Sequence, residues 1–104
     1  MTLLNTSFHM HRSVESDFLE WMKTRYAIAL EQHGGMGCPT FAKVLVITDP
    51  DTVSYCFQMT AASEEQATAW HDSSVAKSLR DELTVCFGES LVHFTTYMEI
   101  MPLR

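Results

Sequence analysis

The chain has 104 residues, which is enough for one domain with its own core and too few for two. Hydrophobic residues make up 46% of the sequence and charged residues 19%, a composition typical of globular proteins. The net charge is −6 and no cluster of Lys or Arg occurs, which argues against nucleic acid and anionic membrane surfaces as partners. We therefore expect a single domain over residues 1–104.

The N-terminal residues lack the basic start and apolar run of a signal peptide, and no apolar run approaches the roughly 20 residues that span a bilayer. We expect a cytoplasmic protein. The cysteines are Cys38, Cys56 and Cys86, an odd number without a CxxC pair, so neither a disulfide framework nor a zinc site is indicated. The thiols are expected to be reduced and mostly buried, and we assign no metal ion and no cofactor.

In the first half of the chain, alternating side chains predict a strand over residues 3–11. A helix is predicted over residues 14–32, because acidic residues occupy its first turn and apolar residues recur at helical spacing. Glycines and a proline in residues 33–39 end it. Residues 41–48 are apolar on both faces, which is typical of a strand buried on both sides.

In the second half, the turn at residues 49–51 precedes a strand over residues 53–61, so these two strands form a hairpin. A capping box at residues 63–66 begins a second helix, whose apolar stripe extends to Gly88. Residues 92–101 alternate as a last strand. The order predicts an α+β ferredoxin-like βαββαβ sandwich, a four-stranded antiparallel sheet with two helices on one face.

In such a sheet the first and third strands are central and one face is left without helices. If the more apolar side of each strand faces the helices, this open face is polar but almost uncharged. Hydroxyls, amides and imidazoles suit a covered interface or a ligand cavity better than a face in water. The candidate ligand-binding residues on the open face are His9, His11, Gln58, His93, Tyr97 and Glu99.

The parity of the first and last strands permits His9 and His93 to be neighbours. Such a pair could bind a metal ion or haem, or act as acid and base near neutral pH. Histidines on a half-buried sheet are more often hydrogen-bonded interface residues, and we favour that interpretation here. Because the commonest soluble assembly is a twofold homodimer, a second copy is the expected cover of the open face.

Several short segments resemble a small bacterial family of domains of unknown function, number 4286 in that series. They are Phe18–Lys23, Ala42–Leu45, Tyr55–Gln58, Ser63–Glu65, Phe87–Gly88 and Phe94–Glu99. The resemblance spans nearly the whole chain and implies a dimeric α/β barrel, a group that includes cofactor-free monooxygenases and haem-handling enzymes. The chain departs from the family's pattern at residues 26–28, Tyr-Ala-Ile, where His-Ile-Pro is typical. The resemblance implies no catalytic residue.

Three functional hypotheses follow, and whether the protein is an enzyme stays open. The first is a non-enzymatic homodimeric module that binds a small apolar or aromatic molecule, or another interaction partner. The second is a cofactor-independent monooxygenase in which His9, His93 or Tyr97 orients and deprotonates an aromatic substrate, which requires a cavity on the order of a few hundred Å³. The third is haem or metal binding at the two histidines.

Overall fold

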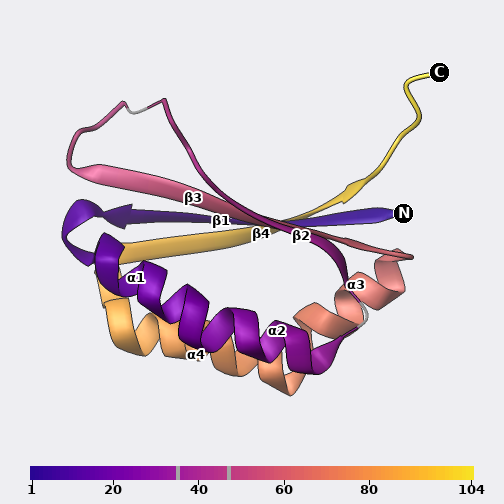
Figure 1. Ribbon diagram of the computed structural model, residues 1–104, viewed down its shortest axis with the longest axis horizontal. Helices are drawn as coiled ribbons and strands as arrows, with labels where there is room; N and C mark the ends of the chain where they lie inside the picture. Colours follow the sequence, from indigo (N-terminus) through magenta and orange to yellow (C-terminus); the bar gives the residue numbers. More distant parts are fainter. Residues whose placement is uncertain (35, 47) are drawn as a thin grey trace.

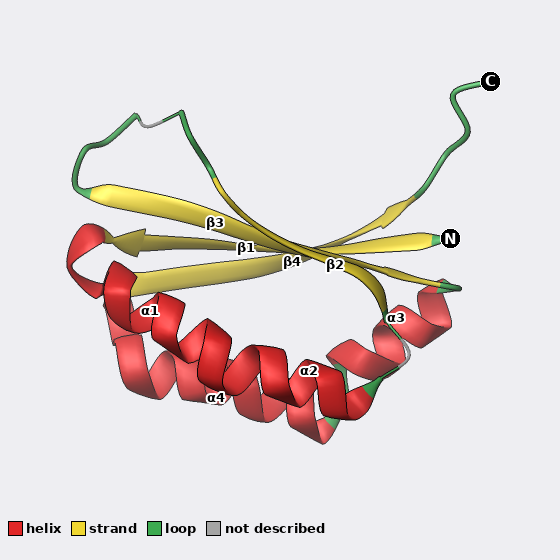
Figure 2. Cartoon of the chain, in the orientation of Figure 1, coloured by secondary structure: helices red, strands yellow, loops and turns green. Residues whose placement is uncertain are grey.

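The computed structural model describes residues 1–34, 36–46 and 48–104. Four strands form one antiparallel sheet in the order β2-β3-β1-β4, with β1 at Thr2–His11, β2 at Gly37–Lys43, β3 at Thr52–Ala61 and β4 at Leu91–Glu99. All helices lie on one face of this sheet, and the other face is open (Figures 1 and 2). The ferredoxin-like α+β fold, with β1 and β3 central, is confirmed.

The first helical region is continuous and has three parts: α1 at Glu15–Trp21, a π-helical turn at Met22–Tyr26, and α2 at Ala27–His33. In the π-turn the amide of Ala27 donates to the carbonyl oxygen of Met22, five residues earlier. Tyr26 is buried against the sheet, whereas Arg25 is exposed and forms a bidentate ion pair with Glu82 of the helix beside it.

The second helical region is two helices and not one, α3 at Glu64–His71 and α4 at Ser74–Phe87. Ser63 caps α3 by accepting a hydrogen bond from the amide of Gln66, as the capping box predicted. Ser73 then interrupts the helix: its backbone is extended, its hydroxyl accepts from the Ala76 amide at 3.1 Å and donates to the Trp70 carbonyl oxygen at 2.6 Å. Local capping by Ser73 therefore outweighs the continuous apolar stripe.

The core fills the space between the helices and the inner face of the sheet. Its largest fully buried side chains are Leu4, Phe8, Phe18 and Met59, and both tryptophans pack within it. Glu15 ties the start of α1 to the sheet, because its carboxylate accepts hydrogen bonds from the Tyr55 hydroxyl at 2.6 Å and the Lys43 ammonium at 2.8 Å. Burial and this carboxylate together raise the pKa of Tyr55 to about 12.

The structure corrects two further predictions. The strand expected at residues 41–48 is β2, an edge strand that begins at Gly37 and is mostly exposed in the single chain, so burial on both sides is wrong here. Residue 47 of that prediction lies outside the described residues. The thiols are free, but Cys38 and Cys86 are exposed and Cys56 is only half-buried. Among the described residues, no helix is long and apolar enough to cross a membrane.

We predict that Ser73→Ala lowers the free energy of unfolding by about 1 kcal/mol, because α4 loses its N-cap acceptor. Urea unfolding followed by circular dichroism measures this change. Ser78→Ala, at an exposed position of α4, is the matched control and is expected to cause no loss. Equal losses for the two variants would show that the cap does not hold the start of α4.

Candidate functional site

The strand register places the predicted site residues on two different faces of the sheet. His9 pairs with Ser54 and Val92, whereas His93 pairs with Phe8. Because neighbouring residues of a strand point to opposite faces, His93 lies on the helix side with Phe8 while His9 lies on the open side. The prediction that His9 and His93 are neighbours is therefore wrong, and no ligand set can be built from that pair.

The same register moves Tyr97 and Glu99 off the open face, since Tyr97 pairs with the buried Leu4 and Glu99 with Thr2. His9, His11 and Gln58 do lie on the open side, as expected. There the His9 Nδ1 lies 2.6 Å from the Ser54 hydroxyl, the His9 ring stacks on Phe94, and His11 bonds locally to Ser13. That His9, His11 and Gln58 bind a ligand stays a prediction.

The sequence pattern failed at β4 because this strand is amphipathic in the opposite sense to the other central strands. Its more apolar side chains, Val92, Phe94 and Met98, are exposed on the open face, whereas His93, Thr95 and Tyr97 are half-buried on the helix side. A shift of one residue exchanges the two faces of a strand. In the observed register, Leu91 at the start of β4 is buried and pairs with the buried Met10 of β1.

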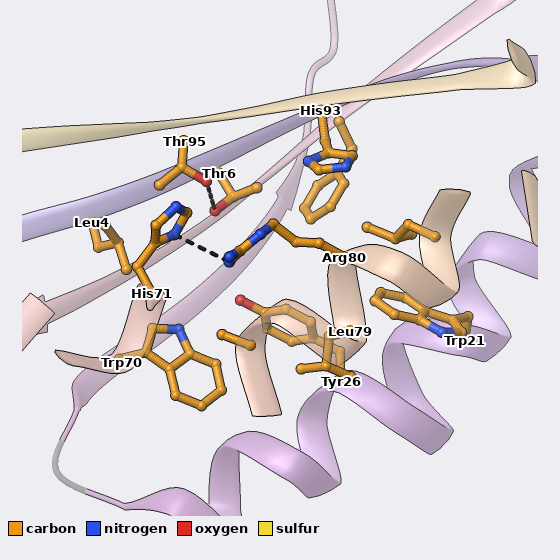
Figure 3. A pocket seen from close by; sticks show the side chains of 13 residues that line it. Leu4, Thr6, Trp21, Tyr26, Trp70, His71, Leu79, Arg80, His93 and Thr95 are labelled. Carbon is orange, nitrogen blue, oxygen red and sulfur yellow. Dashed lines mark hydrogen bonds between the residues drawn. The ribbon is translucent and has the colours of Figure 1, made fainter. Parts of the chain in front are cut away.

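A pocket lies between the helix side of the sheet and the helices, and His93 lines it (Figure 3). Strands β1 and β4 contribute Thr6 and Thr95 to its wall, and the hydroxyls of these two residues are 3.0 Å apart. The helices contribute Tyr26, Trp70, His71 and Arg80. Its free volume is about 30 Å³, which is room for one or two waters, and the remaining wall is apolar.

Local structure explains why these helical side chains converge. Tyr26 ends the π-turn of the first helical region, and Trp70 and His71 end α3 just before the Ser73 cap turns the chain into α4. Arg80 lies in α4 next to the buried Leu79 and extends toward the sheet, with His71, His93 and Thr6 around its side chain in Figure 3. Two interruptions of regular helix therefore shape this site.

Arg80 is the centre of the site's electrostatics. One guanidinium nitrogen of Arg80 lies 3.4 Å from Nδ1 of His71, a long hydrogen bond in which the imidazole accepts. Burial, and then the positive charge of Arg80, lower the pKa of both His71 and His93. Asp72 acts weakly in the other direction on His71. Both imidazoles are therefore neutral at pH 7, and the guanidinium carries the positive charge of the pocket.

Tyr26 is the pocket's phenol. Burial raises the pKa of Tyr26 to about 12, although the Arg80 charge and the Trp70 indole act in the opposite direction. The hydroxyl therefore remains a neutral hydrogen-bond donor. In the part of the chain that the structure describes, no three His, Cys, Asp or Glu side chains gather as they would around a metal ion. Sequence reasoning missed Tyr26, Trp70, His71 and Arg80 as a site, because they come from separate helical segments and form no motif.

These features define the class of the protein: a ferredoxin-like α+β domain with a polar pocket between its sheet and its helices. The chain belongs to the family "Domain of unknown function (DUF4286)", whose model matches residues 1–101. This confirms the resemblance that the short segments indicated. No curated protein matches the sequence.

Solved structures show the same fold at low identity. A protein of the ethyl tert-butyl ether D (EthD) family from Bacillus halodurans is 12% identical, with a TM-score of 0.70 over 97% of this chain and 100% of its own. An Arabidopsis thaliana protein is 12% identical, with a TM-score of 0.71 over 98% of each chain. A candidate antibiotic biosynthesis monooxygenase from Deinococcus radiodurans is 11% identical, with a TM-score of 0.69 over 98% and 95%. These likenesses concern the fold alone.

We predict that stability falls as the pH is lowered from 7 to 5.5. Because the pKa values of His71 and His93 lie below 6.5 in the folded state, the unfolded chain binds more protons, and the stability present above pH 6.5 is lost as pH falls through the folded values. Urea unfolding at the two pH values measures the loss, and the double variant His71→Gln/His93→Gln is expected to show a smaller one. An undiminished pH dependence in that variant would assign the effect to other groups.

Proposed function

We propose that this protein is a homodimeric module that binds a small molecule in the pocket between its sheet and its helices. The convergence of Tyr26, Trp70, His71, Arg80 and His93 on one pocket supports this function. Binding sites typically combine an apolar wall with a few polar groups directed at one point, together with titratable groups whose pKa values are shifted. This pocket has each of these features.

The pocket does not support the monooxygenase alternative better than ligand binding without catalysis. An aromatic substrate held between sheet and helices needs a cavity on the order of a few hundred Å³, and the free volume here is about 30 Å³. Three residues were proposed for that chemistry. His9 lies on the opposite side of the sheet from the pocket, whereas His93 lines the pocket. Tyr97 is not a lining residue, but its ring centroid lies 5.8 Å from that of His71, which is one. A small ligand suits this volume better than a polycyclic substrate.

The open face supports the homodimer. Among the described strand residues, its side chains include no Asp, Glu, Lys or Arg, because β1 and β3 contribute hydroxyls, amides, a thiol and histidines, and β4 contributes an apolar row. In a chain of net charge −6, such a face meets a second copy with little electrostatic repulsion. An apolar patch that a partner would cover is formed by Val92 and Phe94, whose exposed fractions are 59% and 54%.

Two flanking segments extend the same apolar surface. The segment after β2 and the C-terminal residues both rise from the sheet on the side away from the helices (Figure 1). Leu45 and Val46 are exposed in the first segment, and Ile100, Met101 and Leu103 in the second. A twofold mate seated on the open face would contact these segments and bury their side chains.

The pocket is tested by filling it. Ala76 is 4% exposed and lines the pocket, so Ala76→Leu removes free volume, whereas Ala69→Leu places the same side chain at an exposed site on α3. In a fragment screen read by ¹⁵N–¹H NMR, we expect hits that shift the indole signal of Trp70, that persist in Ala69→Leu, and that weaken at least tenfold in folded Ala76→Leu. Hits that bind both variants equally, or a screen without hits, would contradict the proposal.

The dimer is tested by charge. Phe94→Lys places an ammonium on the apolar row of the open face, and desolvating that charge at an interface is costly. Sedimentation equilibrium is expected to give twice the mass of one chain for the wild type and a single-chain mass for Phe94→Lys. Val85→Lys, at a position of α4 that is 85% exposed, is the matched control and should remain dimeric. A wild-type protein of single-chain mass would contradict the homodimer.

A further inference from the structure

The charge of Arg80 is not balanced within its pocket. Of the residues that line the pocket, none is Asp or Glu. The ion pairs of the described chain join Arg25 to Glu82 and Lys43 to Glu15, and neither includes Arg80. Arg80 is half-buried, and the described neighbour that its guanidinium reaches is the neutral imidazole of His71. A partly desolvated cation without a carboxylate partner favours an anion beside it.

The other polar groups of the pocket are hydrogen-bonding groups without charge. The Tyr26 hydroxyl lies below the Arg80 side chain in Figure 3, and the hydroxyls of Thr6 and Thr95 lie beside it. Each hydroxyl can donate one hydrogen bond, and the 3.0 Å bond between the two threonines uses only one of their two protons. A guanidinium with hydroxyl donors around it matches the oxygen atoms of an oxyanion.

Size and charge select among oxyanions. The free volume of about 30 Å³ accommodates a group of a few atoms, and one cation neutralises one negative charge. The guanidinium presents a planar fork of N–H donors, which fits a planar carboxylate with two parallel hydrogen bonds. A phosphate can accept the same two hydrogen bonds, but it is larger and carries more than one negative charge near pH 7, so a single cation in this small volume fits it less well.

We propose that the pocket binds a small monocarboxylate, with its carboxylate paired to the guanidinium of Arg80 and accepting hydrogen bonds from the surrounding hydroxyls. The apolar part of such a ligand would pack against the ring of Trp70 and the aliphatic wall formed by Leu4, Leu79 and Leu83. This inference rests on the proposed ligand-binding function and names the class of ligand.

The test compares acids with their uncharged amides. Acetate and propionate, with acetamide and propionamide as neutral counterparts, are titrated into the 104-residue protein at pH 7 and constant ionic strength. The Arg80 side-chain signals are followed by ¹⁵N–¹H NMR. We expect saturable shifts for at least one acid, and at least tenfold weaker binding for its amide. Inorganic phosphate is titrated in parallel and is expected to bind more weakly than that acid.

Variants assign the binding to Arg80. Arg80→Gln removes the cation and is expected to weaken acid binding at least tenfold, which is followed by the Trp70 indole signal. Arg80→Lys keeps the positive charge and should retain part of the affinity for the acid. If Arg80→Gln folds poorly, the affinity of Arg80→Lys tests the role of Arg80 in its place. Lys77→Gln removes a positive charge from an exposed position of the same helix and should change the affinity less than twofold.

The outcomes separate this inference from the proposed function. Amides that bind as well as acids, or acids that bind Arg80→Gln unchanged, would overturn the carboxylate assignment while fragments that depend on Ala76 still support a ligand pocket. Phosphate binding tighter than either acid would replace the carboxylate with another oxyanion. If neither the acids nor any fragment binds, both proposals fail together.

Discussion

The structure depends on one buried aromatic side chain, Phe18, through which the first helix packs on the sheet. Phe18 of α1 is completely buried, and its ring lies 5.0 Å from Phe8 of β1, 5.6 Å from Tyr55 of β3 and 6.3 Å from Phe87 at the end of α4. It therefore joins the two central strands and both helical regions in one cluster. Aromatic side chains bury large apolar areas, so this cluster helps to hold the helical layer on the sheet.

The pocket lies beside this cluster in the same layer, and Phe8 belongs to both. Where β4 pairs with β1 at the pocket, the inner face of the sheet presents His93 and Thr95 opposite Phe8 and Thr6. These polar side chains cannot fill the space as apolar ones do, and the helices above them are interrupted at the π-turn and at Ser73.

The two proposed roles, ligand binding and dimer formation, belong to opposite sides of the sheet. The helix side carries the pocket with its charged Arg80, and the open side carries an uncharged surface that ends in an apolar row on β4. The edge strand β4 contributes to both faces: its inward polar residues His93 and Thr95 line the pocket, and its outward apolar residues Val92 and Phe94 lie on the open face. A second copy on the open side would cover Phe94 and also hold the strand whose opposite face supports His93.

The sequence by itself determined the element order, the hairpin, the capping at Ser63 and the inward sides of β1 and β3, because these depend on local periodicity and on turn chemistry. It also predicted the family through short segments spread over the chain. Sequence periodicity missed the helix break at Ser73, which local capping produces, and only the tertiary structure decided which side of β4 faces inward and the meeting of Tyr26, His71, Arg80 and His93. The reason is physical: either face of β4 could be buried, and the choice between them depends on packing under α4 and on pairing with β1, whose residues lie 81 to 97 positions away along the chain, from Met10–Leu91 to Thr2–Glu99.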